Sequence, residues 1–120
     1  MLHEDLTAQI IAAAQVVLYE LKPGLHEKIY ERALLIELQE RGLCTNCQKV
    51  FPVNYKGNCV GELIPDLVIN ELVIVDPKVV KAFAEEHVAQ MLGYLAITGL
   101  HVALLLNFKY ASLQVKRVVI

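Results

Sequence analysis

Two short apolar runs interrupted by charged residues set the strongest limits on how this chain can fold. They lie in the segment LIPDLVINELVIVDPK, residues 63–78. In a strand, side chains alternate between the two faces of the sheet, so Asp76 and Lys78 share a face with Ile74, and Asp66 falls among the apolar residues of the first run. Two aspartates and a lysine therefore interrupt two otherwise hydrophobic strands.

Whether the two aspartates meet depends on the turn between these strands. A two-residue loop at Asn70-Glu71 would place Asp66 opposite Val75. An odd-numbered loop centred on Glu71 would place Asp66 opposite Asp76, with both carboxylates on one face. Both registers are compatible with the sequence. A chemical site at this point requires the second.

The other segments complete an α/β pattern. Apolar stripes of helical period predict helices over 3–21 and 25–41, and Lys22-Pro23-Gly24 separates them. Further elements are listed here in chain order: strands at 47–55, 60–69 and 72–80, a helix at 84–98, and strands at 101–108 and 115–120. This order, α-α-β-β-β-α-β-β, predicts a mixed central β-sheet flanked by helices in a single domain over residues 1–120.

Hydrophobic residues make up 56% of the chain, but they occur in short runs. These runs are far below the roughly 18 to 20 residues that a spanning helix needs, and the N-terminus is acidic rather than basic. We therefore expect a cytoplasmic protein with no membrane partner. The net charge of −2 provides no overall basic field, so any contact with nucleic acid must be local. So much apolar sequence in a small domain also predicts a homodimer, in which a second copy covers an apolar patch.

The segment GLHEKIY, residues 24–30, begins the second predicted helix. Tyr30 and Leu34 follow Glu27 by three and seven residues, so helical spacing puts all three on one face, which we expect to be buried. Burying a lone carboxylate is costly unless it is paired or bound to a metal ion. A hydrogen bond to Tyr30, a salt bridge and a favourable position at the helix start are the alternatives to a functional role for Glu27.

The third predicted helix carries a polar stripe. Helical spacing aligns His87, Gln90, Tyr94 and Thr98 on one face, opposite an apolar stripe that we expect to be core, namely Val88, Leu92 and Leu95. An ordinary half-buried helix face is the alternative interpretation of Gln90 and Tyr94. For His87, a hydrogen-bonded structural role is favoured.

Three cysteines are an odd number, which argues against a disulfide framework. Cys44 and Cys47 form C-x-x-C, and Cys59 could add a third metal ligand. No fourth ligand is evident, so we favour small apolar core or strand residues over a zinc or iron–sulfur site.

At these positions the sequence resembles a known family. Gly24, Glu27 and Tyr30 match the signature of the GxxExxY proteins, which are assigned to the PD-(D/E)XK nuclease superfamily. Pro65-Asp66 followed by Asp76-Pro77-Lys78 looks like the motif of that superfamily. The resemblance covers nearly the whole chain. Each motif is weak alone, but their order on these predicted elements is specific.

The resemblance implies a restriction-endonuclease-like core that cleaves phosphodiester bonds of nucleic acid, expected to be DNA, with Mg²⁺ or Mn²⁺. Such hard ions prefer carboxylate and carbonyl oxygens. The implied metal ligands are Asp66, Asp76, Glu27 and the carbonyl of Pro77. Lys78 would orient the attacking water and offset phosphate charge, which completes a catalytic set with the three acids.

QMLGY at 90–94 is similar to the Q-x-x-x-Y motif of RecB-type nucleases. This similarity implies that Gln90 and Tyr94 contact the substrate, and we place Tyr30 with them. Without a metal site, Asp66 would be a turn or strand-end residue, and Asp76 and Lys78 a local surface ion pair.

The sequence departs from the family at one position, because family members more often carry glutamate and an apolar residue where this chain has Asp76-Pro77. Aspartate reaches one methylene less far. Proline lacks an N–H and is expected at a sheet edge, a strand end or a bulge, where the strand would bend and shift Lys78. The alternative to a nuclease is therefore a nuclease-fold module with weak or no catalysis that binds nucleic acid or protein.

Overall fold

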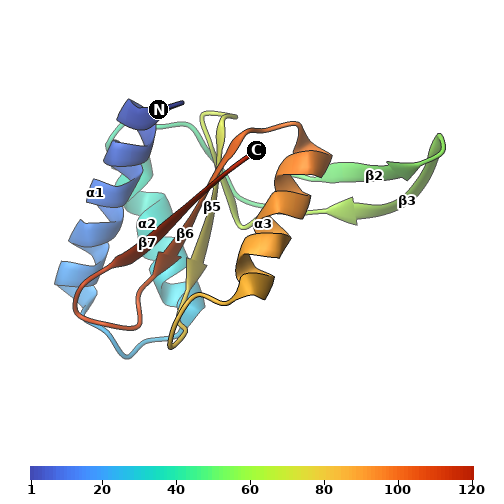
Figure 1. Cartoon of the computed structure of the whole chain (residues 1–120). Coiled ribbons are helices and arrows are strands. Elements are labelled where there is room, and N and C mark those ends of the chain that lie inside the picture. Colours follow the sequence, from blue (N-terminus) through green and yellow to red (C-terminus); the bar gives the residue numbers. More distant parts are fainter.

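A mixed five-stranded sheet lies at the centre of the computed structural model, which describes residues 1–120 (Figure 1). Its spatial order is β1 (Thr45–Asn46), β4 (Leu67–Ile69), β5 (Val73–Lys78), β6 (Val102–Asn107) and β7 (Gln114–Val119). β5 and β6 run parallel, and the other neighbours are antiparallel. The expected α/β class and mixed sheet are confirmed.

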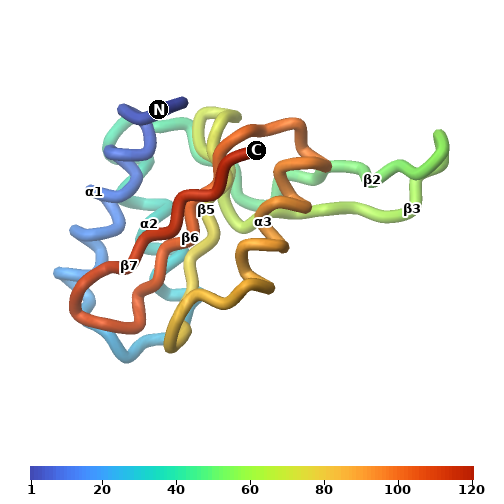
Figure 2. Tube along the Cα trace, viewed as in Figure 1, coloured from blue at the N-terminus to red at the C-terminus, as the bar shows by residue number.

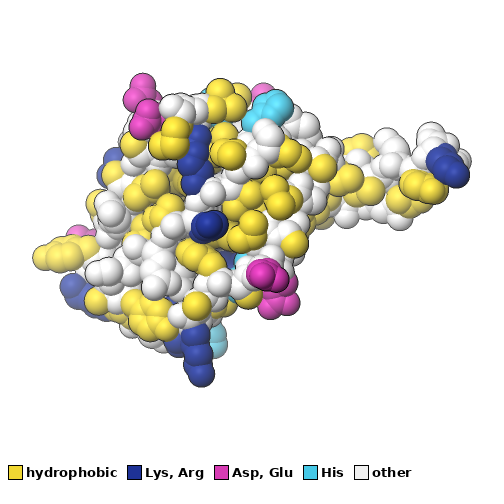
Figure 3. Space-filling model, in the orientation of Figure 1, with side chains coloured by type: hydrophobic (Ala, Val, Ile, Leu, Met, Phe, Trp, Pro, Cys, Tyr) yellow, Lys and Arg dark blue, Asp and Glu magenta, His cyan; other side chains and the backbone are white.

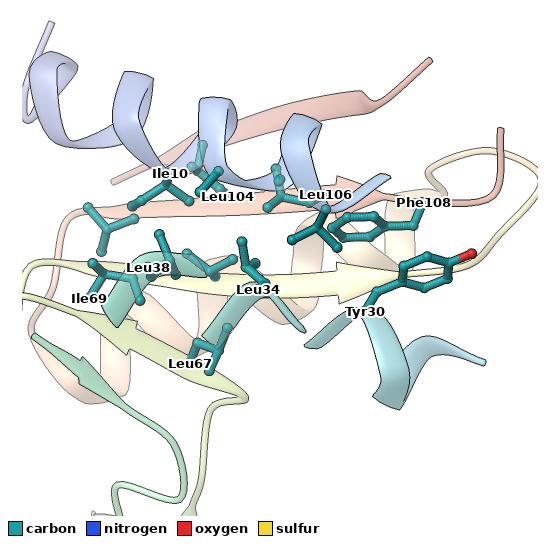
Figure 4. Packing of buried hydrophobic residues seen from close by; sticks show 14 of the residues in the cluster. Ile10, Tyr30, Leu34, Leu38, Leu67, Ile69, Leu104, Leu106 and Phe108 are labelled. Atoms are coloured by element: carbon teal, nitrogen blue, oxygen red, sulfur yellow. The ribbon is translucent and has the colours of Figure 1, made fainter. Parts of the chain in front are cut away.

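Two helices, α1 (Glu4–Leu21) and α2 (Glu27–Glu40), cover one face of this sheet. Their apolar stripes, including Ile10 and Leu34, pack against alternate strand residues such as Val75 and Leu104 (Figure 4). This two-element layer forms the larger core, because each helix buries a full stripe. None of the helices is long and apolar enough to cross a bilayer.

The other face of the sheet is covered by α3 (Glu85–Thr98). Only Met91 and Leu95 of this helix are buried, against strand residues that include Ile74. The expected core stripe is therefore partly wrong, since Leu92 is 40% exposed. The physical reason is that α3 lies alone on this face and has no neighbouring helix to cover its outer side.

A two-stranded hairpin, β2 (Phe51–Tyr55) with β3 (Asn58–Leu63), projects from the body (Figures 1 and 2). The expected strand over 60–69 is thus two strands in different sheets, and five strands rather than three separate α2 from α3. The break falls at residues 64–66, where Pro65 has no N–H for a ladder.

The turn between α1 and α2 is held by Gly24 and Tyr30. Gly24 has φ +108°, a conformation that residues with a Cβ rarely adopt. The Tyr30 hydroxyl donates to the Lys22 carbonyl at 2.7 Å and accepts from the Leu25 N–H at 3.1 Å. Its ring is fully buried and stacks on Phe108, with centroids 4.8 Å apart. Tyr30 therefore fixes where α2 begins.

We predict that Tyr30→Phe lowers the free energy of unfolding by about 1 to 2 kcal/mol, because it removes both hydrogen bonds from a buried hydroxyl and leaves the Leu25 N–H without this partner. Urea denaturation measures the change. Tyr19→Phe is the matched control, since Tyr19 is 74% exposed and should lose almost nothing. Equal effects of the two substitutions would contradict the role assigned to Tyr30.

Candidate active site

Asp66 and Asp76 face each other at the open end of the β4–β5 pair. The pairing register is Leu67 with Val75 and Ile69 with Val73, and one more step along it brings Asp66 opposite Asp76. This is the register centred on Glu71, the second of the two that the sequence allows. The Asp76 side chain is close enough to Asp66 to raise its pKa, which favours the protonated form of Asp66.

The turn that sets this register depends on Asn70. Asn70 and Glu71 have φ values of 52° and 57°, and asparagine tolerates this left-handed region better than most residues. The Asn70 side-chain oxygen accepts from the Cys44 N–H at 2.8 Å, and the Asn70 N–H donates to the Cys44 carbonyl at 2.7 Å. These two bonds tie the turn to the chain before β1.

Two prolines end the β4–β5 ladder beside the carboxylates. The Lys78 carbonyl accepts from the Phe108 N–H at 2.9 Å, so the backbone groups of Lys78 point toward β6. Because the backbone groups of successive strand residues point to opposite neighbours, the Pro77 carbonyl points toward β4. Continuing the register, Pro77 falls opposite Pro65. Neither residue has an N–H, so no ladder bond can form there. Pro77 thus lies in the central strand rather than at an edge, at the point where its neighbour ends.

The Lys78 ammonium lies 3.2 Å from a carboxylate oxygen of Asp76. Both side chains are mostly buried, at 15% and 9% exposure, so this is not the surface ion pair that was the alternative interpretation. Burial, followed by the hydrogen bond and charge of Asp76, raises the pKa of Asp66 from 3.8 to about 6. The site therefore brings together two acidic side chains and the ammonium of Lys78.

The α3 residues Gln90 and Tyr94 lie on the same side of the sheet. Tyr94 is half-buried, and burial followed by the charges of Asp76 and Asp66 raises its pKa. The Gln90 amide donates to the Tyr94 hydroxyl at 3.2 Å. His87 has a structural role instead, because its Nδ1 accepts from the Ala84 N–H at 2.9 Å and caps α3.

Glu27 is exposed at the first position of α2, so its expected burial is wrong. Helical side chains tilt toward the N-terminus, which carries the side chain of a first residue beyond the packed part of the helix. No three acidic, histidine or cysteine side chains gather in a group that could hold a metal ion. Asp66 and Asp76 are thus brought together without Glu27, whose role as a ligand stays a prediction.

Tyr30 is also placed differently from the expectation. Its ring is buried and its hydroxyl makes two hydrogen bonds, which favours a structural role over the predicted contact with substrate. The buried acid of α2 is instead Glu31, which is 9% exposed. It shares a helix face with Leu34 and Leu38, a spacing that could have revealed it.

Asn107 is a site-supporting residue that sequence reasoning missed. It is fully buried and pairs with Lys78 across the parallel strands. Its side-chain amide donates to the Val80 carbonyl at 2.8 Å, and its side-chain oxygen accepts from the Val80 N–H at 3.1 Å. Asn107 therefore fixes the chain just after Lys78. The sequence feature that could have identified it is a single polar residue near the end of the apolar run VALLLNF.

The cysteines do not belong to this core or to a metal cluster. Cys44, Cys47 and Cys59 are all exposed and unpaired. The expectation of core residues is therefore wrong, and that of strand residues holds only for Cys59, which lies in β3. They also do not come together in a group that could bind zinc or iron.

We predict that Asp66→Asn stabilises the metal-free protein at pH 8 and not at pH 4. The pKa of Asp66 is raised in the folded state, so ionising this side chain costs stability as the pH rises between 3.8 and about 6. The cost is complete only above that range, and the neutral asparagine avoids it. Allowing for solvent screening, we expect a gain of about 1 kcal/mol at pH 8. Urea denaturation in a chelator measures it, with exposed Glu62→Gln as control. A less stable Asp66→Asn at pH 8 would contradict the arrangement.

Comparisons with known proteins agree with this geometry. Searches of curated proteins and of solved structures find no match. A family model described as the PD-(D/E)XK nuclease superfamily matches residues 4–118, nearly the whole chain. The helices and mixed sheet have the restriction-endonuclease-like arrangement of that family. The chain belongs to the PD-(D/E)XK nuclease superfamily.

Proposed function

We propose that this protein is a divalent-metal-dependent nuclease that hydrolyses phosphodiester bonds of nucleic acid, with DNA as the expected substrate. The observation that carries the proposal is the convergence of Asp66, Asp76 and Lys78 at the end of two strands. Membership of a nuclease superfamily supports the same chemistry.

The residues present suit Mg²⁺ or Mn²⁺. Two carboxylates face each other, and the Pro77 carbonyl is directed to the side where the ladder has ended. These are the oxygen ligands that hard divalent ions prefer, and a cation would offset both the burial and the neighbouring Asp76 that raise the pKa of Asp66. Glu27 is the proposed third acid. When bound, such an ion neutralises the scissile phosphate and activates water.

Lys78 supplies the positive charge of the protein itself. Its ammonium forms an ion pair with the Asp76 carboxylate at 3.2 Å and carries three N–H donors. These donors are available to a phosphate oxygen or to the attacking water. Because the side chain is mostly buried, its charge is weakly screened and acts strongly on charge that develops in the transition state.

Gln90 and Tyr94 would position the substrate from α3. Their side chains are linked to each other, and the Tyr94 hydroxyl lies within electrostatic reach of both aspartates. Hydrogen-bond donors held in this way can orient a phosphodiester backbone without reading its bases.

The second candidate function is a binding module without catalysis. It is favoured by the observation that only two carboxylates gather, and by aspartate at position 76, where the shorter side chain reaches less far. Metal binding and cleavage separate the two candidates.

We predict that the wild-type protein cleaves plasmid or single-stranded DNA with Mn²⁺, and that Asp76→Asn and Lys78→Met each lower the rate by at least about 100-fold. Lys81→Met is the matched control, because Lys81 is exposed beyond the strand. Calorimetry should show Mn²⁺ binding that Asp66→Asn loses and Lys78→Met keeps. Cleavage that survives in Asp76→Asn would point to a contaminant, and Mn²⁺ binding without any cleavage would favour the binding module.

We also propose that the protein is a homodimer. Apolar side chains gather around α3 (Figure 3), and Leu92 of this helix is 40% exposed. The largest cavity, about 420 Å³, lies on this face and is lined by both Glu85 and Lys116. A second copy related by a two-fold axis could place each glutamate opposite a lysine, so the surface is complementary to itself.

Leu92→Lys is therefore expected to shift the protein from dimer to monomer, because it places a charge in the apolar contact. Light scattering after size-exclusion chromatography measures the mass. Ile36→Lys is the control, since Ile36 is 58% exposed on α2, a helix that covers the other face of the sheet. A wild-type monomer, or a Leu92→Lys dimer, would contradict the proposed interface.

A further inference from the structure

A groove beside the two aspartates is formed by α2 and the segment that follows β1. Its volume is about 230 Å³, and its lining includes Lys28 and Arg32 from α2, Gln48 from the opposite wall, and Leu67 at one end. Leu67 directly follows Asp66 in the chain. Successive strand residues point to opposite faces, so Leu67 and the groove lie on the α2 face of the sheet, while Asp66 lies with Asp76 at the open end of the same strand pair. The groove is therefore one residue away from the proposed catalytic carboxylates.

The groove has a local positive charge in a protein whose net charge is −2. Lys28 and Arg32 are four residues apart on one face of α2, where their like charges repel each other. The hydrogen bond and charge of Glu31 nevertheless raise the pKa of Lys28. Lys28 is anchored, because its ammonium lies 2.6 Å from the carboxylate of the mostly buried Glu31. Arg32 is exposed and makes no salt bridge. One acid thus offsets two cations.

The cations of the groove also interact electrostatically with the proposed catalytic carboxylates. Burial and Asp76 raise the pKa of Asp66, and the Lys28 charge partly opposes this rise, so the two side chains lie within reach of each other's field. On the opposite wall, Gln48 holds a left-handed backbone with φ 73°, an uncommon conformation for a residue other than glycine. Its side-chain amide supplies neutral hydrogen-bond donors and acceptors at the lining.

We propose that this groove binds the phosphate backbone of a nucleic-acid strand next to the phosphate held at Asp66 and Asp76, with Arg32 and Lys28 as the phosphate-binding cations. The inference rests on the proposed function and extends it by assigning the path of the substrate. A phosphodiester chain repeats its negative charge at short intervals, so one strand can place one phosphate at the carboxylate pair and a neighbouring phosphate at the cations. The proposed contact is to the backbone of one strand, which either single-stranded or duplex substrate can supply.

The test measures binding rather than cleavage, in a protein that carries Asp76→Asn to prevent turnover. Fluorescence anisotropy follows a labelled single strand and a labelled duplex over a range of KCl concentrations. Adding Arg32→Gln should weaken binding about 5- to 10-fold and make the salt dependence shallower by about 0.7 to 0.9 in log–log slope, because one phosphate contact is lost. Lys28→Gln should act in the same direction.

Arg41→Gln is the matched control. Arg41 lies at the C-terminal end of α2, directly after its last residue, and forms an ion pair with Glu37 at 3.4 Å. It should leave both affinity and salt slope unchanged. Equal affinities and slopes for Arg32→Gln and Arg41→Gln, with both variants folded by thermal denaturation, would overturn the groove assignment.

The experiments distinguish an error in the groove assignment from an error in the proposed nuclease function. If Arg32→Gln leaves binding unchanged while the wild-type protein cleaves DNA with Mn²⁺, the groove assignment is wrong and the nuclease stands. If Arg32 controls binding in a protein that neither binds Mn²⁺ nor cleaves, the groove is supported and the nuclease is overturned. A wild-type protein that binds neither form of nucleic acid would overturn both.

Discussion

The register between β4 and β5 is the constraint on which the site depends. A shift of one residue would move every side chain of β4 to the other face and separate Asp66 from Asp76. Asn70 prevents this shift, because its two hydrogen bonds to Cys44 hold a turn that has left-handed backbone at both central residues. The chemistry at one end of the strands therefore depends on a turn at the other end.

The position where the ladder stops follows from the same register. Pro65 and Pro77 are opposite each other at a point where an antiparallel pair would exchange two N–H bonds, and neither can donate one. The strands are free to separate there, while the preceding Leu67–Val75 pair remains in place. Two aspartates next to these prolines therefore face a gap between strands rather than a continuous ladder. The β4–β5 register thus accounts both for the meeting of the two aspartates and for the opening that a cation would need.

Sequence periodicity predicted the features that local pattern can specify. It gave the three helices, the central strands and the shared face of Asp76 and Lys78, because alternation and helical spacing depend only on neighbours along the chain. It failed for Glu27, because spacing shows which face a residue shares and not whether the helix extends past the sheet at that point. Asn107 was missed for a similar reason, since its partner Val80 lies far away in sequence.

The hairpin shows a further limit of local pattern. Residues 60–69 have strand character throughout, yet β3 and β4 belong to different sheets. Pro65 marks the break, but the sequence alone does not indicate that the chain changes partner there. The exposure of α3 has the same cause, because burial depends on what covers a helix as well as on its own stripe.

The departure of Asp76-Pro77-Lys78 from the usual family pattern has less effect than proline in a central strand suggests. Pro77 is directed toward β4, which has already ended, so the missing N–H removes no ladder bond. Lys78 is held independently, through its carbonyl bond to Phe108 and through the Asn107 clamp on Val80. Its ammonium consequently stays beside Asp76. The proline thus frees a carbonyl without displacing the lysine, and the shorter aspartate is the one change in the motif that alters the reach of a functional group.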